Sequence, residues 1–295
     1  MAAWGRTPVA EYLITGGEGQ LGVALASSAP GTAVALGRAD LDVGDPVAVA
    51  RVMAQVRPTL VVHAGAYTDV DGCETDRQRA WRVNAEGTAH LARACDAVAA
   101  RLVYVSTDYV FPGDASVPYE PGDPLRPASV YGESKLGGEL AVRTLLPQGH
   151  AIVRTSWVFA ARGRNFVRTI LRLAAERPEL RVVDDQRGRP TYADDLAGWI
   201  WALAARGATG TFHACNAGEC TWFGFAREIV ARAGLSARVL PVSTAEFPRP
   251  ARRPRYSVLS TESFTAATGI EPRPWTEALT DVLRDLDATG GGRQP

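Results

Sequence analysis

Tyr131 and Lys135 stand four residues apart, and Lys135 is the only lysine in a chain with 32 lysine and arginine residues. Residues at this spacing share one face of a helix. An ammonium group beside a phenol stabilises the phenolate and lowers its pKa from about 10. Such a tyrosine can protonate the alkoxide that forms when hydride reaches a carbonyl group. The pair therefore predicts carbonyl reduction, although the same spacing is also common on helix surfaces.

The scarcity of lysine itself carries information. Abundant arginine, alanine and glycine indicate a GC-rich genome, in which surface lysines are readily replaced by arginine. A lysine is then expected to persist where a compact ammonium group is needed, because lysine and arginine differ in pKa, shape and donor geometry. Chance survival of Lys135 is the alternative.

A hydroxyl group for the same chemistry is expected at the end of a strand over Leu102–Ser106. Ligands of doubly wound sheets bind at the carboxyl ends of the strands. Thr107 is therefore the predicted donor to the substrate carbonyl, with Asp108 as a further substrate contact. The alternative is a local turn in which Asp108 caps the backbone.

Three glycines follow the first predicted strand at a spacing of three residues. Gly16 would allow a tight turn, Gly19 would let the backbone approach a pyrophosphate, and Gly22 would let helix and strand pack closely. The amides that follow, at Gln20 and Leu21, would face the phosphates. The turn predicts dinucleotide binding, with a purely structural turn as the alternative.

The end of the second predicted strand bears on which dinucleotide is bound. An acidic residue there would hold the ribose 2′-hydroxyl of NAD, but Gly37 stands at this place and Arg38 follows. Arg38 can accept a 2′-phosphate, which favours NADPH and leaves NADH open, unless Arg38 is simply solvated. Asp42 and Val43 are expected beside the adenine, and the small residues Ala64, Gly65 and Ala66 beside the ribose and pyrophosphate.

These residues need a scaffold in which strands alternate with helices. The pattern predicts an α/β fold with a doubly wound parallel (Rossmann) sheet and helices on both of its faces. Strands are expected over Glu11–Thr15, Thr32–Leu36, Leu60–Ala64, Leu102–Ser106, Ile152–Thr155 and Thr211–Ala214. Helices are expected over Gln20–Ser28, Pro46–Val56 (with Asp45 as N-cap), Asp76–Val98, Val130–Leu146 (interrupted at Gly137–Gly138), Asn165–Arg177, Tyr192–Arg206, Trp222–Ala233 and Ala278–Leu286.

The chain is expected to fold into two portions of unequal size. Residues 10–160 are predicted to form an NAD(P)-binding Rossmann domain, with a returning segment near 190–215. Residues 161–290 are predicted to form a smaller, interleaved α/β portion that is mainly substrate-binding. The tail ATGGGRQP, residues 288–295, is expected to be disordered.

Composition limits the class of protein. Acids and bases balance at 32 each, which argues against nucleic acid and against anionic membranes as partners. No apolar run approaches the roughly 18 residues of a membrane span. The first ten residues lack the apolar core of a signal peptide, and the four cysteines do not resemble a disulfide framework. A cytoplasmic location is expected.

Some residues resemble metal ligands or aromatic platforms. His213, Cys215 and Cys220 fit no zinc spacing, so no metal site is predicted there. His63 ends an apolar strand and is expected to be an interior histidine with hydrogen-bond partners. The tryptophans of segment 199–201 are expected in the core or at a subunit interface.

Taken together, these features resemble extended short-chain dehydrogenase/reductases and, more narrowly, the dTDP-4-dehydrorhamnose reductase family. The similarity runs from about residue 12 to about residue 270. The stretches that carry it are LITGGEGQLG, VVHAGAYTDVDGCE, VNAEGTAHLA, STDYVFPGD, VYGESKLGGE, VRTSWVFA and VVDDQRGRPTYADDLA.

The resemblance implies that NAD(P)H reduces the 4-keto group of dTDP-4-dehydro-L-rhamnose to give dTDP-L-rhamnose. It implies that Thr107, Tyr131 and Lys135 are catalytic, that the last two also contact the cofactor, and that Trp157 touches the sugar. It also implies the cofactor contacts given above, namely Gly16, Gly19, Gln20, Leu21, Gly22, Arg38, Asp42, Val43, Ala64, Gly65 and Ala66.

Three further features stay open. The arginine cluster Arg249–Arg255 either meets the dTDP phosphates or is a solvated loop. A homodimer is expected, and the resemblance implies that acidic residues such as Asp194 lie at a dimer contact that binds Mg²⁺ in some relatives. Dehydratases resemble one another in an Asp-Glu pair after the strand-end threonine, but here Tyr109 follows Asp108, which argues for simple reduction.

Two alternative functions remain from the sequence. One is a sibling nucleotide-deoxysugar ketoreductase, such as a dTDP-dihydrostreptose synthase. The other is a non-catalytic regulatory subunit, since the regulatory subunit of methionine adenosyltransferase resembles this family. An intact set of Thr107, Tyr131 and Lys135 argues against the second.

Overall fold

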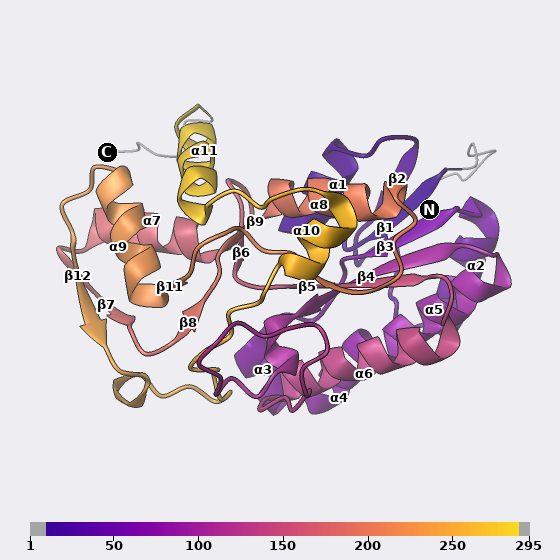
Figure 1. Cartoon of the computed structure of the whole chain (residues 1–295), viewed down its shortest axis with the longest axis horizontal. Coiled ribbons are helices and arrows are strands. Elements are labelled where there is room, and N and C mark those ends of the chain that lie inside the picture. The colour runs from indigo at the N-terminus through magenta and orange to yellow at the C-terminus, as the bar shows by residue number, and fades with distance from the viewer. Residues whose placement is uncertain (1–9, 289–295) are drawn as a thin grey trace.

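A six-stranded parallel sheet forms the centre of the computed structural model, which describes residues 10–288 (Figure 1). Its strands, in spatial order, are β10 (Gly210–His213), β5 (His150–Thr155), β4 (Arg101–Thr107), β3 (Leu60–His63), β1 (Tyr12–Thr15) and β2 (Ala33–Leu36). All pairings in it are parallel. The predicted doubly wound sheet is confirmed. The expected disorder of the tail falls on residues 289–295, which lie outside the described residues.

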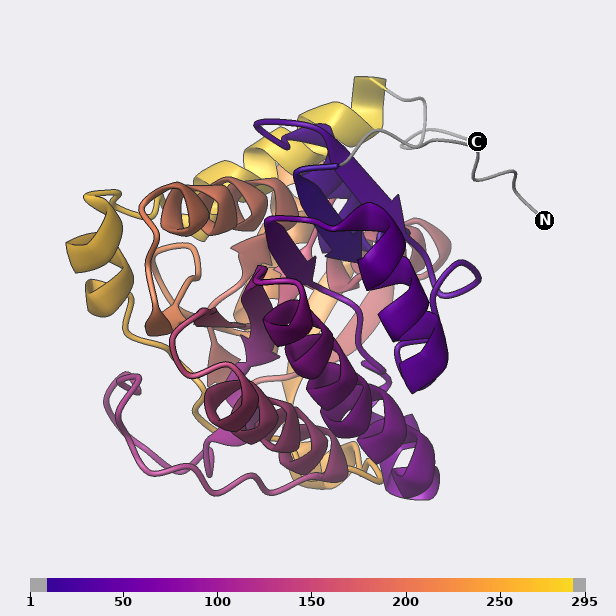
Figure 2. The ribbon, with the colours of Figure 1, turned by 90° about the vertical axis from the view of Figure 1, so that its right-hand side faces the viewer.

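Helices cover both faces of this sheet, as Figures 1 and 2 show. One face carries α1 (Gln20–Ser27), α8 (Ala193–Ala205) and α10 (Glu262–Thr268), and the other carries α2 (Pro46–Val56), α5 (Gly87–Ala97) and α6 (Val130–Leu145). Because both faces are covered, the central strands β3 and β5 are buried at every position. No helix within residues 10–288 has the length and apolar character that a membrane span needs.

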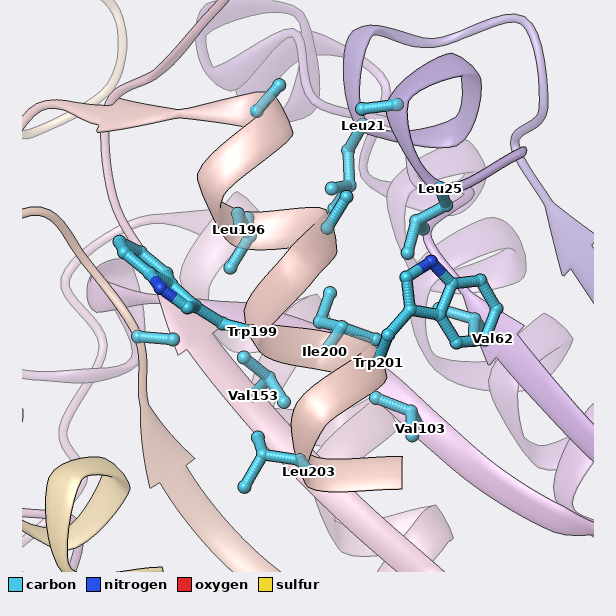
Figure 3. Close-up of a cluster of buried hydrophobic side chains, with 14 of the residues drawn as sticks. Leu21, Leu25, Val62, Val103, Val153, Leu196, Trp199, Ile200, Trp201 and Leu203 are labelled. Atoms are coloured by element: carbon cyan, nitrogen blue, oxygen red, sulfur yellow. The ribbon is translucent and has the colours of Figure 1, made fainter. Parts of the chain in front are cut away.

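The two tryptophans of α8 lie in the core on the first face (Figure 3). Trp199 and Trp201 are each only 7% exposed and pack among residues of α1 and the sheet. The ring of Trp201 lies 4.9 Å from that of Tyr12 at the start of β1. The expectation of a core position for both tryptophans is confirmed, and residues 193–213 return to the main sheet as α8 and β10.

A second group of elements forms a smaller α/β portion with its own apolar core, seen on the left of Figure 1. Its helices are α7 (Phe166–Glu176), α9 (Trp222–Arg232) and α11 (Trp275–Ala288). Its strand pairs are β7 (Glu179–Val183) with β12 (Arg238–Val242), β8 (Arg187–Gly188) with β11 (Cys220–Thr221), and β6 (Val158–Phe159) with β9 (Thr191–Tyr192). Sequence patterning missed these strands because most of them are too short to show a period.

The predicted helix over Asp76–Val98 is confirmed, because the chain is helical without a break from Arg77 to Ala97, and a π-helical segment lies inside it. It consists of α4 (Arg77–Trp81), a π-helical turn over Arg82–Glu86, and α5, and it is preceded by α3 (Val70–Thr75). Asp76 ends α3 and caps α4 by accepting a hydrogen bond from the backbone of Arg79. π-helical segments inside α-helices often lie at functional sites.

Helix α6 also differs from its prediction. The expected interruption at Gly137–Gly138 is wrong, because α6 is continuous from Val130 to Leu145. A Cβ on Gly138 would overlap the hydroxyl group of Tyr104 and the backbone of Asn84. The glycine is needed for close packing against β4 and the π turn. The predicted N-cap of α2 is confirmed, since Asp45 accepts from Val47 N at 2.9 Å.

Candidate active site

A pocket of about 690 Å³ opens at the carboxyl ends of the central strands. All the residues predicted to be catalytic, cofactor-binding or substrate-binding line it: Gly16, Gly19, Gln20, Leu21, Gly22, Arg38, Asp42, Val43, Ala64, Gly65, Ala66, Thr107, Asp108, Tyr131, Lys135 and Trp157. Trp222 and Arg253 of the C-terminal portion line it too. The topology therefore brings together residues from both portions of the chain at the place where ligands of doubly wound sheets bind.

The glycine-rich turn forms the floor at one end. Gly16 has φ +71°, and a Cβ there would lie 2.6 Å from the Cα of Gly65. A Cβ on Gly22 would overlap the carbonyl of Gly16. Gly19 is the N-cap of α1, and no side chain caps the amides that follow. Unfilled backbone donors at a helix N-terminus fit the pyrophosphate of a dinucleotide.

Two contacts join this turn to the C-terminal portion. Asn165, the N-cap of α7, donates from Nδ2 to Gln20 Oε1 at 2.9 Å. Gln20 Nε2 donates to the carbonyl of Arg164 at 3.4 Å. The start of α1 is thereby tied to the start of α7, at a side of the pocket that no local sequence signal indicated.

The adenosine end of the pocket lies beside β2 and the loop after it. Asp42 forms an ion pair with Arg82 and accepts a hydrogen bond from Gly44 N at 3.0 Å. Burial opposes ionisation, but these partners hold the pKa of Asp42 below its ordinary value. Val43 is buried beside it. Arg38 is exposed at the rim.

His63, at the end of β3, has partners on both ring nitrogens. Its Nδ1 lies 2.6 Å from Thr15 Oγ1, and its Nε2 lies 3.2 Å from Thr88 Oγ1. Burial, assisted by the charge of Lys135, lowers the pKa of His63 to about 3. The ring is therefore neutral, and the expectation of an interior histidine with partners is confirmed.

Asn84, in the π turn, is a residue that sequence reasoning missed. Its side chain accepts from Tyr67 N at 2.8 Å and donates to Ser134 Oγ at 3.0 Å. Ser134 lies between Tyr131 and Lys135 on α6. Asn84 therefore fixes the loop after β3 against the catalytic helix, and only the Asn-containing stretch VNAEGTAHLA marked it in the sequence.

Lys135 is buried, with an exposed fraction of 2%. Its Nζ donates to the carbonyl of Val105 at 2.7 Å and lies 4.1 Å from the ring centroid of Tyr104. Burial lowers the pKa of Lys135 to about 7, while the charge of Glu139 acts in the opposite direction. The lysine therefore titrates near neutrality, far below an exposed lysine.

The pKa of Tyr131 differs from the one expected from the sequence. Its pKa lies above the ordinary value because burial raises it, with a hydrogen bond to Thr107 opposing this effect. The expectation that Lys135 lowers the pKa of this phenol is wrong for this structure, because Nζ points to the carbonyl of Val105 instead. A tyrosine that holds its proton is suited to act as a general acid.

Thr107 and Asp108 lie next to Tyr131. Thr107 Oγ1 donates to Asp108 Oδ1 at 2.9 Å and accepts from Tyr109 N at 3.2 Å. Burial raises the pKa of Asp108 to about 6, and Asp108 Oδ2 has no hydrogen-bond partner among the described residues. A capping turn is thus present, but its capping side chain is Thr107 and not Asp108, and both side chains lie at the pocket wall.

Trp157 and Trp222 form the wall on the C-terminal side. Trp157 has φ +48°, which is unusual for a residue with a side chain. Its ring stacks on that of Trp222, with centroids 3.6 Å apart and an angle of 11° between the planes. Trp222 was not predicted, because an aromatic residue at the start of α9 has no distinctive local signal.

One member of the arginine cluster reaches the pocket. Arg253 donates to the hydroxyl of Tyr109 at 3.0 Å and forms an ion pair with Asp71 at 3.0 Å. Arg249 lies 4.0 Å from the same carboxylate. Arg253 is therefore a phosphate-binding candidate, and Arg249 is exposed outside the pocket lining.

Residues 10–288 match the family model described as the RmlD substrate binding domain. The chain belongs to this family. It is 44% identical to a dTDP-4-dehydrorhamnose reductase of Streptomyces griseus, over 98% of each chain. It is 41% identical to a dTDP-4-keto-6-deoxy-D-glucose reductase of Streptomyces niveus, over 94% of this chain and 98% of that one.

A solved relative has the same fold as this RmlD family member. It is the dTDP-4-dehydrorhamnose reductase of Bacillus anthracis in complex with NADP, which superimposes with a TM-score of 0.91 at 39% identity. The match covers 93% of this chain and 98% of that one. The family resemblance inferred from the sequence is confirmed.

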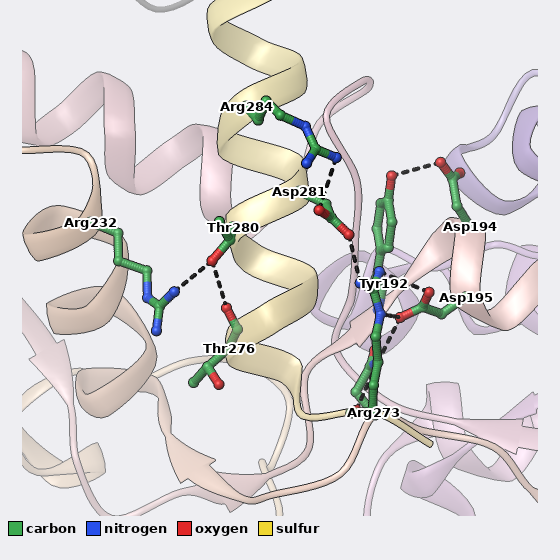
Figure 4. Close-up of polar contacts among 10 residues, drawn as sticks. Tyr192, Asp194, Asp195, Arg232, Arg273, Thr276, Thr280, Asp281 and Arg284 are labelled. Atoms are coloured by element: carbon green, nitrogen blue, oxygen red, sulfur yellow. Dashed lines mark hydrogen bonds and ion pairs between the residues drawn. The ribbon is translucent and has the colours of Figure 1, made fainter. Parts of the chain in front are cut away.

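The Mg²⁺ expectation finds no support in this RmlD family member. Asp194 accepts a hydrogen bond from the hydroxyl of Tyr192 at 2.6 Å, and Asp195 pairs with Arg273, which also binds Asp281 of α11 (Figure 4). Within residues 10–288 there is no group of three side chains that could hold a metal ion. Asp195 joins α8 to α11 through Arg273, whereas Asp194 bonds to Tyr192 of β9.

Burial of Lys135 makes the stability of this RmlD family member depend on pH. The pKa of Lys135 is about 7 in the folded chain and close to 10.5 when the chain is unfolded, so the unfolded chain binds more protons between these values. The contribution to stability is therefore present above about pH 10.5 and lost as pH falls to about 7. Chemical denaturation should show that the free energy of unfolding rises more steeply between pH 7 and pH 9 in the unaltered protein than in Lys135→Met. Parallel pH profiles for the two proteins would contradict this.

Proposed function

We propose that this protein uses NAD(P)H to reduce the 4-keto group of dTDP-4-dehydro-L-rhamnose, giving dTDP-L-rhamnose. One observation supports this proposal above all: the side chains of Thr107, Tyr131 and Lys135 line the same pocket as the glycine-rich turn. The names of its relatives support the substrate. A cytoplasmic location and a homodimer stay predictions from the sequence.

Each catalytic residue has a role that its position allows. The nicotinamide, when bound, supplies hydride to the carbonyl carbon. Tyr131 donates its proton to the carbonyl oxygen, so that the C=O bond becomes CH–OH. Thr107 turns its hydroxyl proton from Asp108 Oδ1 to the same oxygen, and Lys135 would hold the nicotinamide ribose beside Tyr131. Trp157 forms the wall beside the sugar, and Arg253 binds the diphosphate.

A direct assay tests this function. The purified protein, mixed with dTDP-4-dehydro-L-rhamnose and either NADPH or NADH, should consume the absorbance of the reduced nicotinamide and form one equivalent of dTDP-L-rhamnose. Tyr131→Phe, which keeps the ring and lacks the proton, is the matched control. Absence of oxidation with both cofactors would refute the proposal.

A sibling ketoreductase is the second candidate. The similarity to the enzyme of Streptomyces niveus favours it, because that relative is named for a different 4-keto sugar. Identification of the product by NMR separates the two functions. A stoichiometric protein partner together with absent reductase activity would instead indicate a regulatory subunit.

The stack of Trp222 on Trp157 should affect sugar binding. Trp222→Leu removes the aromatic surface that supports Trp157 in its left-handed backbone conformation. We expect KM for the dTDP-sugar to rise about tenfold, since aromatic pairs contribute roughly 0.5–1.5 kcal/mol beyond area burial. Steady-state kinetics check this, and Trp222→Phe should recover most of the loss. An unchanged KM for Trp222→Leu would show that the stack does not shape the sugar site.

A further inference from the structure

An acidic side chain lies at the end of β2 although the sequence has glycine there. Glu18, from the glycine-rich turn, lies over Gly37: a Cβ built on Gly37 would be 2.7 Å from both Cγ and Oε1 of Glu18. The side chain of Glu18 thus occupies the space that a side chain at position 37 would need. In dinucleotide folds an acid at this strand end binds the adenosine ribose.

The other acids near this strand end are already engaged. Asp40 accepts a hydrogen bond from Gly37 N at 2.9 Å, and Asp42 pairs with Arg82. Glu18, by contrast, makes no hydrogen bond or ion pair within the described part of the chain and lines the pocket. Its carboxylate is therefore the acid available to a ligand at this place.

Arg38 lies beside Gly37 and lines the same end of the pocket. It is exposed and likewise has no ion pair within residues 10–288. A carboxylate accepts hydrogen bonds from the two ribose hydroxyls of NADH, whereas it repels the doubly charged 2′-phosphate of NADPH. A guanidinium group favours that phosphate. The two side chains therefore act on the two cofactors in opposite directions.

We propose that Glu18 and Arg38 together set the choice between NADH and NADPH, with Glu18 favouring NADH and Arg38 favouring NADPH. The inference rests on the proposed use of a nicotinamide cofactor. Both side chains are exposed, so solvent screens each of them and the protein should accept both cofactors with a modest preference.

Direct binding tests this assignment without the sugar substrate. The dissociation constants of NADPH and NADH are measured by fluorescence titration for the unaltered protein, for Glu18→Gln and for Arg38→Gln. Glutamine keeps the length of Glu18 and removes its charge. We expect Glu18→Gln to raise the ratio of NADPH to NADH affinity about tenfold, and Arg38→Gln to lower it about tenfold.

The ionic strength provides a second readout. The change in NADPH affinity caused by Glu18→Gln should shrink at high salt, because the repulsion is between exposed charges. A ratio within about twofold of the unaltered protein in Glu18→Gln would overturn the role of Glu18. Failure of the unaltered protein to bind either cofactor would overturn the proposed function as well, so the two failures are distinguishable.

Discussion

Lys135→Arg is expected to lower kcat by about 100-fold or more, because it displaces the cofactor from Tyr131, and a positioned acid–base group contributes on this scale. The ammonium group occupies a closed space between the carbonyl of Val105 and the ring of Tyr104. A guanidinium group is larger and planar, and it cannot give up its proton near neutral pH. The measurement is kcat at saturating cofactor and sugar, with Lys135→Met as a second variant that lacks the charge.

The control for this variant separates chemistry from folding. Thermal unfolding and cofactor titration should show a folded protein that still binds NADPH. If Lys135→Arg keeps kcat within about tenfold of the unaltered protein, the ammonium group is not required. The survival of one lysine in an arginine-rich chain would then be chance.

Arg154→Met is expected to reduce the free energy of unfolding by about 3–5 kcal/mol, the range for breaking a buried ion pair. Arg154 and Glu139 are both fully buried, and Arg154 donates to Glu139 from Nε at 2.8 Å and from Nη2 at 2.7 Å. Burial raises the pKa of Glu139, but Arg154 and Ser106 outweigh this and hold it below the ordinary value. Without Arg154, this carboxylate lacks its main partner.

Arg143→Met is the matched control for this prediction. Arg143 also pairs with Glu139, at 2.9 Å, but its side chain is 32% exposed. Its loss should cost less than about 1 kcal/mol, as for ion pairs near the surface. Urea denaturation of both variants makes the comparison, and the double variant Glu139→Gln with Arg154→Met should recover part of the loss. Equal effects of the two single variants would contradict the argument from burial.

The sequence predicted best those site residues that are defined by short spacings and lie at the ends of the parallel strands. The glycines of the first turn, Thr107 at a strand end and the Tyr131–Lys135 pair all depend on short spacings, and the parallel sheet brings them to one edge. The same reasoning could not find Trp222. Its place in the pocket depends on how α9 packs against α7 and β7 and how Trp222 meets Trp157, which are tertiary relations.

The errors have a common physical origin. Gly137–Gly138 suggested a break, yet Gly138 permits close packing of α6 on Tyr104 and Asn84, and Gly137 permits it on Trp81 and Ala85. Lys135 was expected to lower the pKa of Tyr131, yet burial of the phenol raises it and Lys135 Nζ donates to the carbonyl of Val105. In both cases the deciding factor is a distant neighbour, which a local spacing does not specify.

The four cysteines can report local unfolding in different parts of the chain. Cys73, Cys95, Cys215 and Cys220 are all buried, and each belongs to a different core cluster. Burial raises the pKa of three of these thiols, Cys73, Cys95 and Cys220, to about 12, so few thiolates exist to react at neutral pH. A thiol reagent therefore labels each cysteine at a rate set by the local unfolding of its own cluster. Labelling rates, resolved by peptide, would rank the cores by kinetic stability without any engineered probe.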